Sequence, residues 1–448
     1  MSYSFGVPEL DEIVGGVRRG TVVAIAGPPG AGKTTLVLHM LKANVKESHK
    51  ALYLSFNETL EKLARAASSI GYSEFEKEVK EGAIRFVRVP SLNSKELVEE
   101  VSTEVFKALS SGTDIIVIDS ITPLLHIFEG YAEARTWLQT FLYDTLSRYS
   151  GTAFLVIDDV AIPPLAYQFV RFVSDVVLKI DYMTLDDGSY SRKLRIEKAR
   201  GSAASKAVLR FSITRRGIRV YDYVAKRVRE ELLPRRRSIE LPCEEYKKLL
   251  GVEKLSPGTQ IAVVGTEAEV MYSLEMLRHM LKLVRTLVGM KLNVAIQSFD
   301  PTLNSVLRNE LSRVDGSVRE RVRFFDVSVG QVSAEQVVVY DVEIASSKDP
   351  LYDVYLVFGL ERGLEYYQAS LEKMGYVPPV VLRNYGLTTI RYYGSFEGKI
   401  PRSMAVFSDM VVRVKMYRGE LWMEPVKSYG PTELAVPLSH VDEKCLTG

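Results

Sequence analysis

The residues best suited to chemistry lie in the stretch TVVAIAGPPGAGKTT, residues 21–35. Gly27, four further residues, and then Gly32, Lys33 and Thr34 form the pattern G-x-x-x-x-G-K-S/T, between an apolar run and a helix-compatible stretch. Glycines let backbone amides converge on a phosphate, and a helix directs its positive end at the same anion. The lysine can then reach the β- and γ-phosphates, and the threonine hydroxyl can bind Mg²⁺. The pattern predicts a site for a nucleoside triphosphate. The residues expected to contact the nucleotide are Gly27, Pro28, Pro29, Gly30, Ala31, Gly32, Lys33, Thr34 and Thr35.

Two acidic residues follow other predicted strands and complete the expected site. Asp119 ends the apolar strand IIVID, and behind a phosphate loop such an acid holds Mg²⁺ together with the hydroxyl of Thr34. Glu58 lies just beyond the strand ALYLSF and is our candidate for orienting or deprotonating the attacking water. Acids also favour the first turn of a helix, so Glu58 could instead serve to begin the helix predicted over residues 59–70.

A pair of cations, Lys198 and Arg200, lies in the segment EKARGS at the end of a predicted strand. Two residues apart on a strand, they share a face. They lie too far along the sheet to serve their own phosphate loop. They suit a catalytic role toward the γ-phosphate of a neighbouring subunit, where cations stabilise transferred charge. A solvated strand edge protected by cations explains them equally well.

Alternating strands and helices must position these residues. Strands are predicted at 21–26, 51–56, 83–89, 114–120 and 152–158, with helical stretches between them. This alternation predicts an α/β fold with a mostly parallel central sheet flanked by helices. From residue 175 to residue 223 successive strands follow one another with turns between them, which predicts an antiparallel extension of the sheet.

The second half of the chain repeats the first in altered form. SPGTQIAVVG (256–265) matches RRGTVVAIAG (18–27), and later segments match in the same order, which indicates duplication. We therefore predict two RecA-like P-loop domains in tandem: residues 1–223, a linker at 224–257, and residues 258–448. The Arg-rich cluster 235–237 in that linker is expected to be solvated.

The chemistry is absent from the second copy. Met271 stands where the lysine would be, and Phe358 stands where the strand-end aspartate would be. Glu267 and Glu269 would place negative charge where a phosphate should lie, and two like charges about 4 Å apart repel by about 4 kcal/mol at an effective dielectric of 20. The second domain is predicted to keep the fold and to lack both the phosphate loop and the metal-binding acid.

Composition sets broad limits. The chain has 448 residues, 46% hydrophobic and 25% charged, and a net charge of +2, which indicates neither a polyanion-binding protein nor an acidic disordered chain. Cys243 and Cys445 show no paired spacing, so we expect neither a disulfide framework nor a zinc module. Such cysteine usage is typical of a protein in a reducing compartment. The N-terminal residues do not resemble a signal peptide and no apolar run approaches about 18 residues, so we expect a cytoplasmic protein without membrane contact.

The order of these segments over residues 5–220 resembles the KaiC-like ATPases of the RecA superfamily, most closely those of archaea: FGVPELDEIVGG, GPPGAGKTT, ALYLSFNET, IIVIDSIT, FVSDVVLKI, LRIEKARG and FSITRRGI. The resemblance implies ATP hydrolysis with Mg²⁺ and a homo-oligomeric ring, such as a hexamer, with nucleotide at the subunit interfaces. Lys198-Ala199-Arg200-Gly201 matches the family's Lys-x-Arg-Gly, which contacts nucleotide across that interface. Where the family has two glutamates after the second strand, this chain has Asn57 and Glu58, which predicts slow hydrolysis. Without a second phosphate loop, autokinase activity is not expected.

The leading hypothesis is a slow ATPase with a regulatory or switching role, with room for a protein partner. A recombinase-like ATPase that binds DNA is a second hypothesis, which the sequence disfavours. The segment after the strand at 152–158 starts acidic and contains no glycine, and only Tyr167 and Arg171 there could contact nucleic acid. A non-hydrolysing ATP-sensing scaffold is a third hypothesis, motivated by Asn57.

Overall fold

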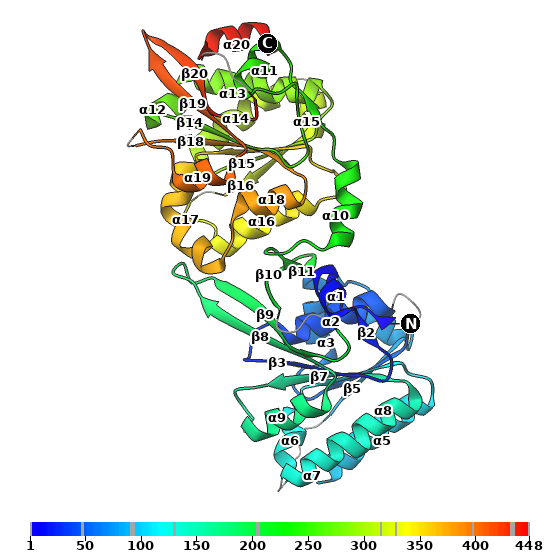
Figure 1. Ribbon diagram of the computed structural model, residues 1–448. Coiled ribbons are helices and arrows are strands. Elements are labelled where there is room, and N and C mark those ends of the chain that lie inside the picture. Colours follow the sequence, from blue (N-terminus) through cyan, green and yellow to red (C-terminus); the bar gives the residue numbers. More distant parts are fainter. Residues whose placement is uncertain are drawn as a thin grey trace. The chain divides into compact units, whose positions relative to one another are not determined.

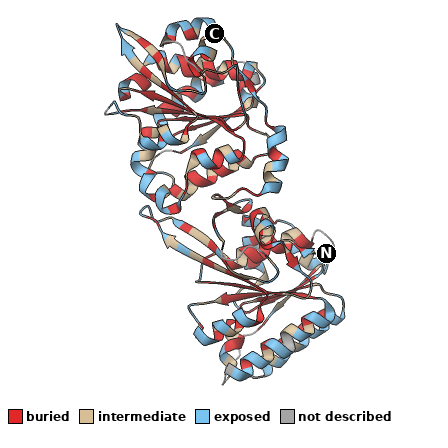
Figure 2. Ribbon diagram, in the orientation of Figure 1, coloured by how far each residue is buried: buried red, intermediate tan, exposed pale blue. Residues whose placement is uncertain are grey.

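The computed structural model describes residues 2–45, 49–89, 95–128, 131–162, 164–202, 207–313, 316–327, 329–396, 398–430 and 435–446. The chain divides into two compact units (Figure 1). Unit 1 comprises residues 1–184 and 190–225, and unit 2 comprises residues 185–189 and 226–448. In both units the strands are mostly buried and the outer faces of the helices are exposed (Figure 2).

Unit 1 is built on a nine-stranded sheet with the order β11-β10-β9-β8-β3-β7-β6-β4-β5. The strands from β8 to β5 in this order run parallel, and β9, β10 and β11 extend the sheet antiparallel. The strands are β3 (Val22–Gly27), β4 (Ala51–Ser55), β5 (Ile84–Arg88), β6 (Ile115–Asp119), β7 (Thr152–Asp158), β8 (Val176–Thr184), β9 (Tyr190–Ala199), β10 (Val208–Thr214) and β11 (Gly217–Val220). A separate short pair is β1 (Ser2–Tyr3) and β2 (Val17–Arg18).

Helices cover both faces of this sheet, and a separate apolar core lies between the helices and the sheet on each face. One face carries α1 (Pro8–Val14), α2 (Lys33–Val45), α3 (Leu60–Ser69) and α4 (Phe75–Lys80). The other carries α5 (Lys95–Ser110), α6 (Thr122–Ile127), α7 (Tyr131–Thr136), the π-helix η1 (Trp137–Tyr143), α8 (Asp144–Tyr149) and α9 (Pro164–Val173). A parallel strand with both faces covered needs apolar side chains on both sides, which is why the run VVAIA of β3 is buried throughout.

Unit 2 has an eight-stranded sheet with the order β16-β15-β17-β18-β14-β19-β20-β21. The strands are β14 (Gln260–Gly265), β15 (Val294–Ser298), β16 (Val322–Asp326), β17 (Val354–Phe358), β18 (Thr388–Gly394), β19 (Met410–Tyr417), β20 (Glu420–Lys427) and β21 (Val436–Pro437). One face carries α11 (Glu244–Leu250), α12 (Ala268–Met271), α13 (Leu274–Gly289), α14 (Pro301–Ser312), α15 (Gly316–Arg321) and α20 (Leu438–Lys444). On the other lie α16 (Ala334–Ser346), α17 (Leu360–Met374), α18 (Pro378–Asn384) and α19 (Arg402–Phe407).

The two sheets have the same topology. When the strands are numbered from β3 in unit 1 and from β14 in unit 2, both sheets have the order 3-2-4-5-1-6-7, and the seventh strand is antiparallel to the sixth in each. The chain therefore contains two RecA-like α/β domains in tandem, as the sequence predicted.

Residues 226–257, part of the linker that we predicted at 224–257, lie in unit 2. They form α10 (Lys226–Leu232), the 3-10 helix η2 (Leu233–Arg235), the paired strands β12 (Ile239–Glu240) and β13 (Lys254–Leu255), and α11. Ile239 and Tyr246 pack into the core of unit 2. Arg236 is only 6% exposed and donates to the carbonyl oxygen of Ala345 at 2.7 Å, so the expectation of a solvated arginine cluster is wrong for this residue.

A disulfide joins Cys243 to Cys445, with the two Cα atoms 5.0 Å apart. It corrects our expectation that the spacing excluded such a bond. The two cysteines are 202 residues apart, so only the docking of the C-terminal α20 beside α11 brings them together. Across the described residues, no helix is both long enough and apolar enough to cross a membrane.

Candidate functional site

The phosphate loop, residues 27–32, joins the buried β3 to α2 at the carboxyl end of the parallel strands, the edge where open α/β sheets bind ligands. Gly30 and Gly32 have φ angles of +76° and +108°, in the left-handed region that favours glycine. A Cβ atom on Gly27 would lie 2.3 Å from the carbonyl oxygen of Ile180. The three glycines therefore meet requirements of the backbone itself.

Lys33 lies folded over this loop and is only 7% exposed. Its Nζ donates to the carbonyl oxygens of Gly27 and Pro28, both at 2.9 Å, and lies 2.7 Å from Oδ1 of Asp158. Asp158 ends β7 directly opposite Gly27 in the strand register. Sequence reasoning did not identify Asp158. The available signal was an acid at the end of the strand TAFLVID, but its meaning depended on β7 pairing with β3.

Asp119 and Thr34, the two residues predicted to bind the metal ion, contact each other. The Thr34 hydroxyl donates to Oδ2 of Asp119 at 2.9 Å, and the Tyr53 hydroxyl donates to the same oxygen at 2.7 Å. Burial raises the pKa of Asp119, and these two hydrogen bonds oppose the rise. A hydroxyl and a carboxylate oxygen at this distance are the hard donors that Mg²⁺ prefers, so the residues present fit the ion. Tyr53 was not predicted, because nothing in the sequence places it beside Asp119.

Glu58 lies at the same edge of the sheet. Ser55, which faces Asp119 across the register of β4 and β6, holds the turn by accepting from the Glu58 N–H at 3.1 Å and donating to the Glu58 carbonyl at 2.8 Å. The side chain of Glu58 is 45% exposed, and its carboxylate lies 3.7 Å from Nζ of Lys62. Thr59 is the N-cap of α3, so Glu58 precedes the cap and does not lie in the first turn.

Lys198 and Arg200 lie at the opposite end of the sheet from the phosphate loop. Lys198 faces Val177, at the start of β8, and its Nζ donates to the carbonyl oxygens of Arg171 and Phe172 at 2.8 and 3.0 Å. Arg200 pairs with Asp175 at 3.1 Å and also donates to Phe172. Both cations therefore cap the C-terminal end of α9, a favourable position for positive charge. The structure does not bring them to their own phosphate loop.

Unit 2 repeats part of this arrangement without a phosphate loop. Lys427 occupies in β20 the register position that Lys198 occupies in β9. It donates to the carbonyl oxygens of Ala405 and Ser408 at the end of α19. Capping of the preceding helix is thus an architectural role that does not depend on a nucleotide.

The counterpart of the phosphate loop in unit 2 is filled by protein. Met271 is buried, and a Cβ atom on Gly265 would meet its Cγ at 2.7 Å. The chain forms the short α12 there and restarts as α13 after the N-cap Ser273, so no continuous helix begins at the strand. Phe358 ends β17 opposite Ser298, as Asp119 ends β6 opposite Ser55. Met271 and Phe358 thus stand where unit 1 has Lys33 and Asp119, and the hydroxyl of Tyr272, in the position of Thr34, donates to Glu361.

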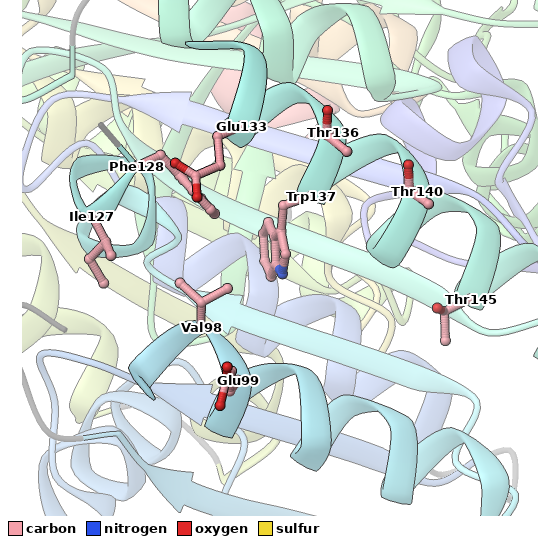
Figure 3. A pocket seen from close by; sticks show the side chains of 9 residues that line it. All are labelled: Val98, Glu99, Ile127, Phe128, Glu133, Thr136, Trp137, Thr140 and Thr145. Carbon is pink, nitrogen blue, oxygen red and sulfur yellow. The ribbon is translucent and has the colours of Figure 1, made fainter. Parts of the chain in front are cut away.

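A separate cavity of about 570 Å³ in unit 1 lies between α5 and the stretch from the end of α6 to α8. Figure 3 shows the indole of Trp137 extending into it from η1, with Phe128 and Glu133 beside it and Glu99 on α5 below. The Trp137 Nε1 donates to Ser102 Oγ at 3.1 Å. This cavity lies on the sheet face opposite α2, so it is not part of the nucleotide site.

In unit 1 a phosphate loop with left-handed glycines precedes a helix, and an acid ends each of the parallel strands β6 and β7. Together these features define unit 1 as a P-loop ATPase domain of the RecA type. A family model described as "ATPase: KaiC" matches residues 3–224. Unit 1 belongs to the KaiC-like ATPases of the RecA superfamily.

The curated relatives agree with this assignment. The circadian clock oscillator protein KaiC of Thermostichus vulcanus is 24% identical over 234 residues, which cover 49% of this chain and 42% of that protein. KaiC 1 of Synechocystis sp. is 25% identical with the same coverage, and KaiC of Prochlorococcus marinus is 24% identical over 44% of its length. The matched region thus spans less than half of each of these relatives.

Proposed function

We propose that unit 1 binds ATP with Mg²⁺ and hydrolyses it slowly. The observation that carries this proposal is the contact between Thr34 and Asp119 beside a phosphate loop whose glycine at position 27 leaves no room for a Cβ atom. In this proposal Thr34 and Asp119 hold the metal ion, which supplies charge neutralisation when bound. When ATP binds, the Lys33 ammonium leaves the carbonyl oxygens of the loop and donates to phosphate oxygens instead. Before ATP binds, its contact with Asp158 keeps the ammonium in position.

In this proposal Glu58 orients the attacking water, since it follows β4 at the carboxyl edge of the sheet, where Ser55 lies opposite Asp119, and its side chain is 45% exposed. Lys198 and Arg200 act only in an assembly, where they would lie at the far end of one subunit and face the phosphate loop of the next. A closed ring of subunits repeats such a head-to-tail contact. The output would be regulatory, with unit 2 as a pseudo-ATPase domain that lacks autokinase activity.

The test is release of inorganic phosphate from Mg·ATP by the purified full chain, run beside size measurement with ATP, with ADP and without nucleotide. The wild-type protein should release phosphate slowly and should form a larger assembly when ATP is present. Lys33→Ala should lose phosphate release, whereas Lys107→Ala on the outside of α5 should retain it. Release unchanged in Lys33→Ala would contradict the proposal.

A non-hydrolysing ATP-sensing scaffold is the second candidate, and the contact between Glu58 and Lys62 favours it. In this candidate the Lys62 ammonium occupies the Glu58 carboxylate, and Asn57 offers no carboxylate to the attacking water. This alternative predicts assembly with ATP but no release of phosphate, and the same paired measurement separates the two.

DNA binding is less well supported. Tyr167 donates to Glu197 at 3.1 Å, and Arg171 lies 3.2 Å from the same carboxylate, so both candidate contacts already have partners on β9. Asp159, after β7, pairs with Lys179 at 3.0 Å. A gel-shift with single-stranded and duplex DNA at physiological salt should show no complex.

A further inference from the structure

Unit 2 buries a polar cluster on the sheet face that carries α16 to α19. Three neighbouring strands each contribute one of its side chains: Gln297 from β15, Tyr355 from β17 and Arg391 from β18. All three are at most 5% exposed. Buried charged and amide groups are rare in a sheet interior unless something satisfies them.

The same three positions are purely apolar in unit 1. Because Ser298 faces Phe358 as Ser55 faces Asp119, and because Arg391 faces Ala262 as Leu155 faces Ala24, the two registers can be superposed residue by residue. The counterparts of the polar residues are Leu54, Ile116 and Leu155, all fully buried in the core of unit 1. The fold therefore does not require polar groups here, and unit 2 carries them in addition to the common architecture.

The acidic member of the cluster is already satisfied. Asp341 from α16 accepts from the hydroxyl of Tyr355 at 2.7 Å and from that of Tyr376 at 2.9 Å, one on each carboxylate oxygen. Tyr355 also contacts the side-chain oxygen of Gln297. The carboxylate is thus held by two phenols, and Arg391 attracts it without any hydrogen bond between the two side chains among the described residues.

The basic member is not satisfied. Arg391 donates through one terminal nitrogen to Ser408 Oγ at 3.1 Å, while its buried Nε lacks a partner among the described residues. A guanidinium offers five donors and accepts nothing. The groups of the cluster that can still form hydrogen bonds are therefore the N–H donors of a cation.

Arg391 and Asp341 both line a cavity of about 210 Å³ whose remaining walls are mainly apolar, including Phe299, Leu360 and Met404. The exposed lining residues Gln368, Glu372 and Ser403 place its mouth between α17 and α19, and Gln368 donates to Glu372 there at 2.8 Å. An apolar cavity of about 150 Å³ suffices for a benzene ring, so this one has room for a ring with a small substituent.

We propose that this cavity is a ligand site for a small organic acid, with its carboxylate on Arg391 and its apolar body against the sheet and α17. Charge-assisted hydrogen bonds between a guanidinium and a carboxylate are among the strongest available to a protein. An apolar pocket with few convergent polar groups is the usual form of a small-molecule site. Unit 2 would thus have lost a nucleotide site at one edge of its sheet and gained an acid-binding site within one face.

The test uses 4-fluorobenzoate with the full-length protein, observed by fluorine NMR, with 4-fluorobenzyl alcohol as the uncharged analogue. We expect saturable one-to-one binding of the acid and at least tenfold weaker binding of the alcohol. Lys33→Ala should bind the acid as wild type does, because the nucleotide site is separate. No saturable binding of the acid, or equal binding of acid and alcohol, would overturn the proposal.

The matched variant is Arg391→Leu, which installs the residue type that unit 1 has at this position and should abolish binding. If this variant does not unfold cooperatively, Arg391→Gln takes its place, since it removes the charge and keeps a polar chain. Arg391→Lys should retain part of the affinity. Binding unchanged in the leucine or glutamine variant would show that the arginine does not hold the carboxylate.

Discussion

Units 1 and 2 have the same order for their seven common strands but differ in which charged side chains they bury and where. In unit 1, Lys33, Asp119 and Asp158 gather at the carboxyl edge of the sheet, and the sheet faces are apolar. In unit 2 Met271 closes the loop at that edge, the acids buried there, Asp300 and Glu361, contact Arg362 and Tyr272, and a face of the sheet also carries Arg391. The comparison teaches that strand order and strand chemistry are separable: the backbone pairing is kept while side chains relocate the polar site.

The largest expected difference between the units comes from the disulfide, which lies in unit 2 alone. The double variant Cys243→Ser/Cys445→Ser should lower the unfolding free energy of unit 2 by up to about 5 kcal/mol, the chain-entropy value for so long a loop. The two tryptophans, Trp137 and Trp422, fall one in each unit, so fluorescence in the Trp137→Phe background reports unit 2. An equal loss in unit 1, followed in Trp422→Phe, would contradict a local effect.

A second difference is the pH dependence of unit 2. Burial raises the pKa of Asp341 from 3.8 to about 6. Folding thus favours the neutral acid, and this contribution to stability is complete below pH of about 4 and lost as pH rises through about 6. The shift corresponds to on the order of 3 kcal/mol.

Asp341→Asn, which cannot ionise, should remove this fall. Urea unfolding at several pH values between 4 and 6, followed by Trp422 fluorescence, would check it. The same slope in wild type and variant would show that another group is responsible.

The third difference concerns phosphate release. Substitution of Asp119, which we propose to bind the metal ion in unit 1, should reduce it, whereas substitution of an exposed acid in unit 2 should not. Asp119→Asn should reduce phosphate release by about 100-fold or more, because a charged ligand to the ion is lost where charge develops. Asp326→Asn, at the end of β16 in unit 2 and exposed, is the control and should leave turnover unchanged. A variant of Asp119 that keeps full activity would exclude the hydroxyl–carboxylate pair from catalysis.

The smallest expected effect compares the two helix-capping lysines. Lys198→Ala and Lys427→Ala should each lower the stability of their own unit by about 1 kcal/mol. If Lys198 also acts across a subunit interface, as proposed, only Lys198→Ala should reduce phosphate release, by about tenfold or more. Equal stability losses with turnover unchanged in both would leave capping as the only role.

Local patterns predicted much of unit 1. The phosphate loop is recognisable because Gly30 and Gly32 must adopt left-handed conformations within a few residues of the lysine. The place of Asp119 beside Thr34 was predictable because Asp119 ends an apolar strand in a chain with a phosphate loop. Asp158 was missed, since a strand-end acid gains meaning only when its strand is known to lie beside β3.

By itself, the sequence determined the alternation of strands and helices, the duplication, and the presence of the phosphate loop in one copy only. Those properties depend on residues that are neighbours along the chain, where periodicity and backbone preference act directly. The tertiary structure alone decided the partner of Lys33, the union of Cys243 with Cys445, and the burial of Arg391 beside a cavity. The physical reason is that each of these contacts joins segments far apart in sequence, and strand order, which no local pattern encodes, determines which side chains share a space.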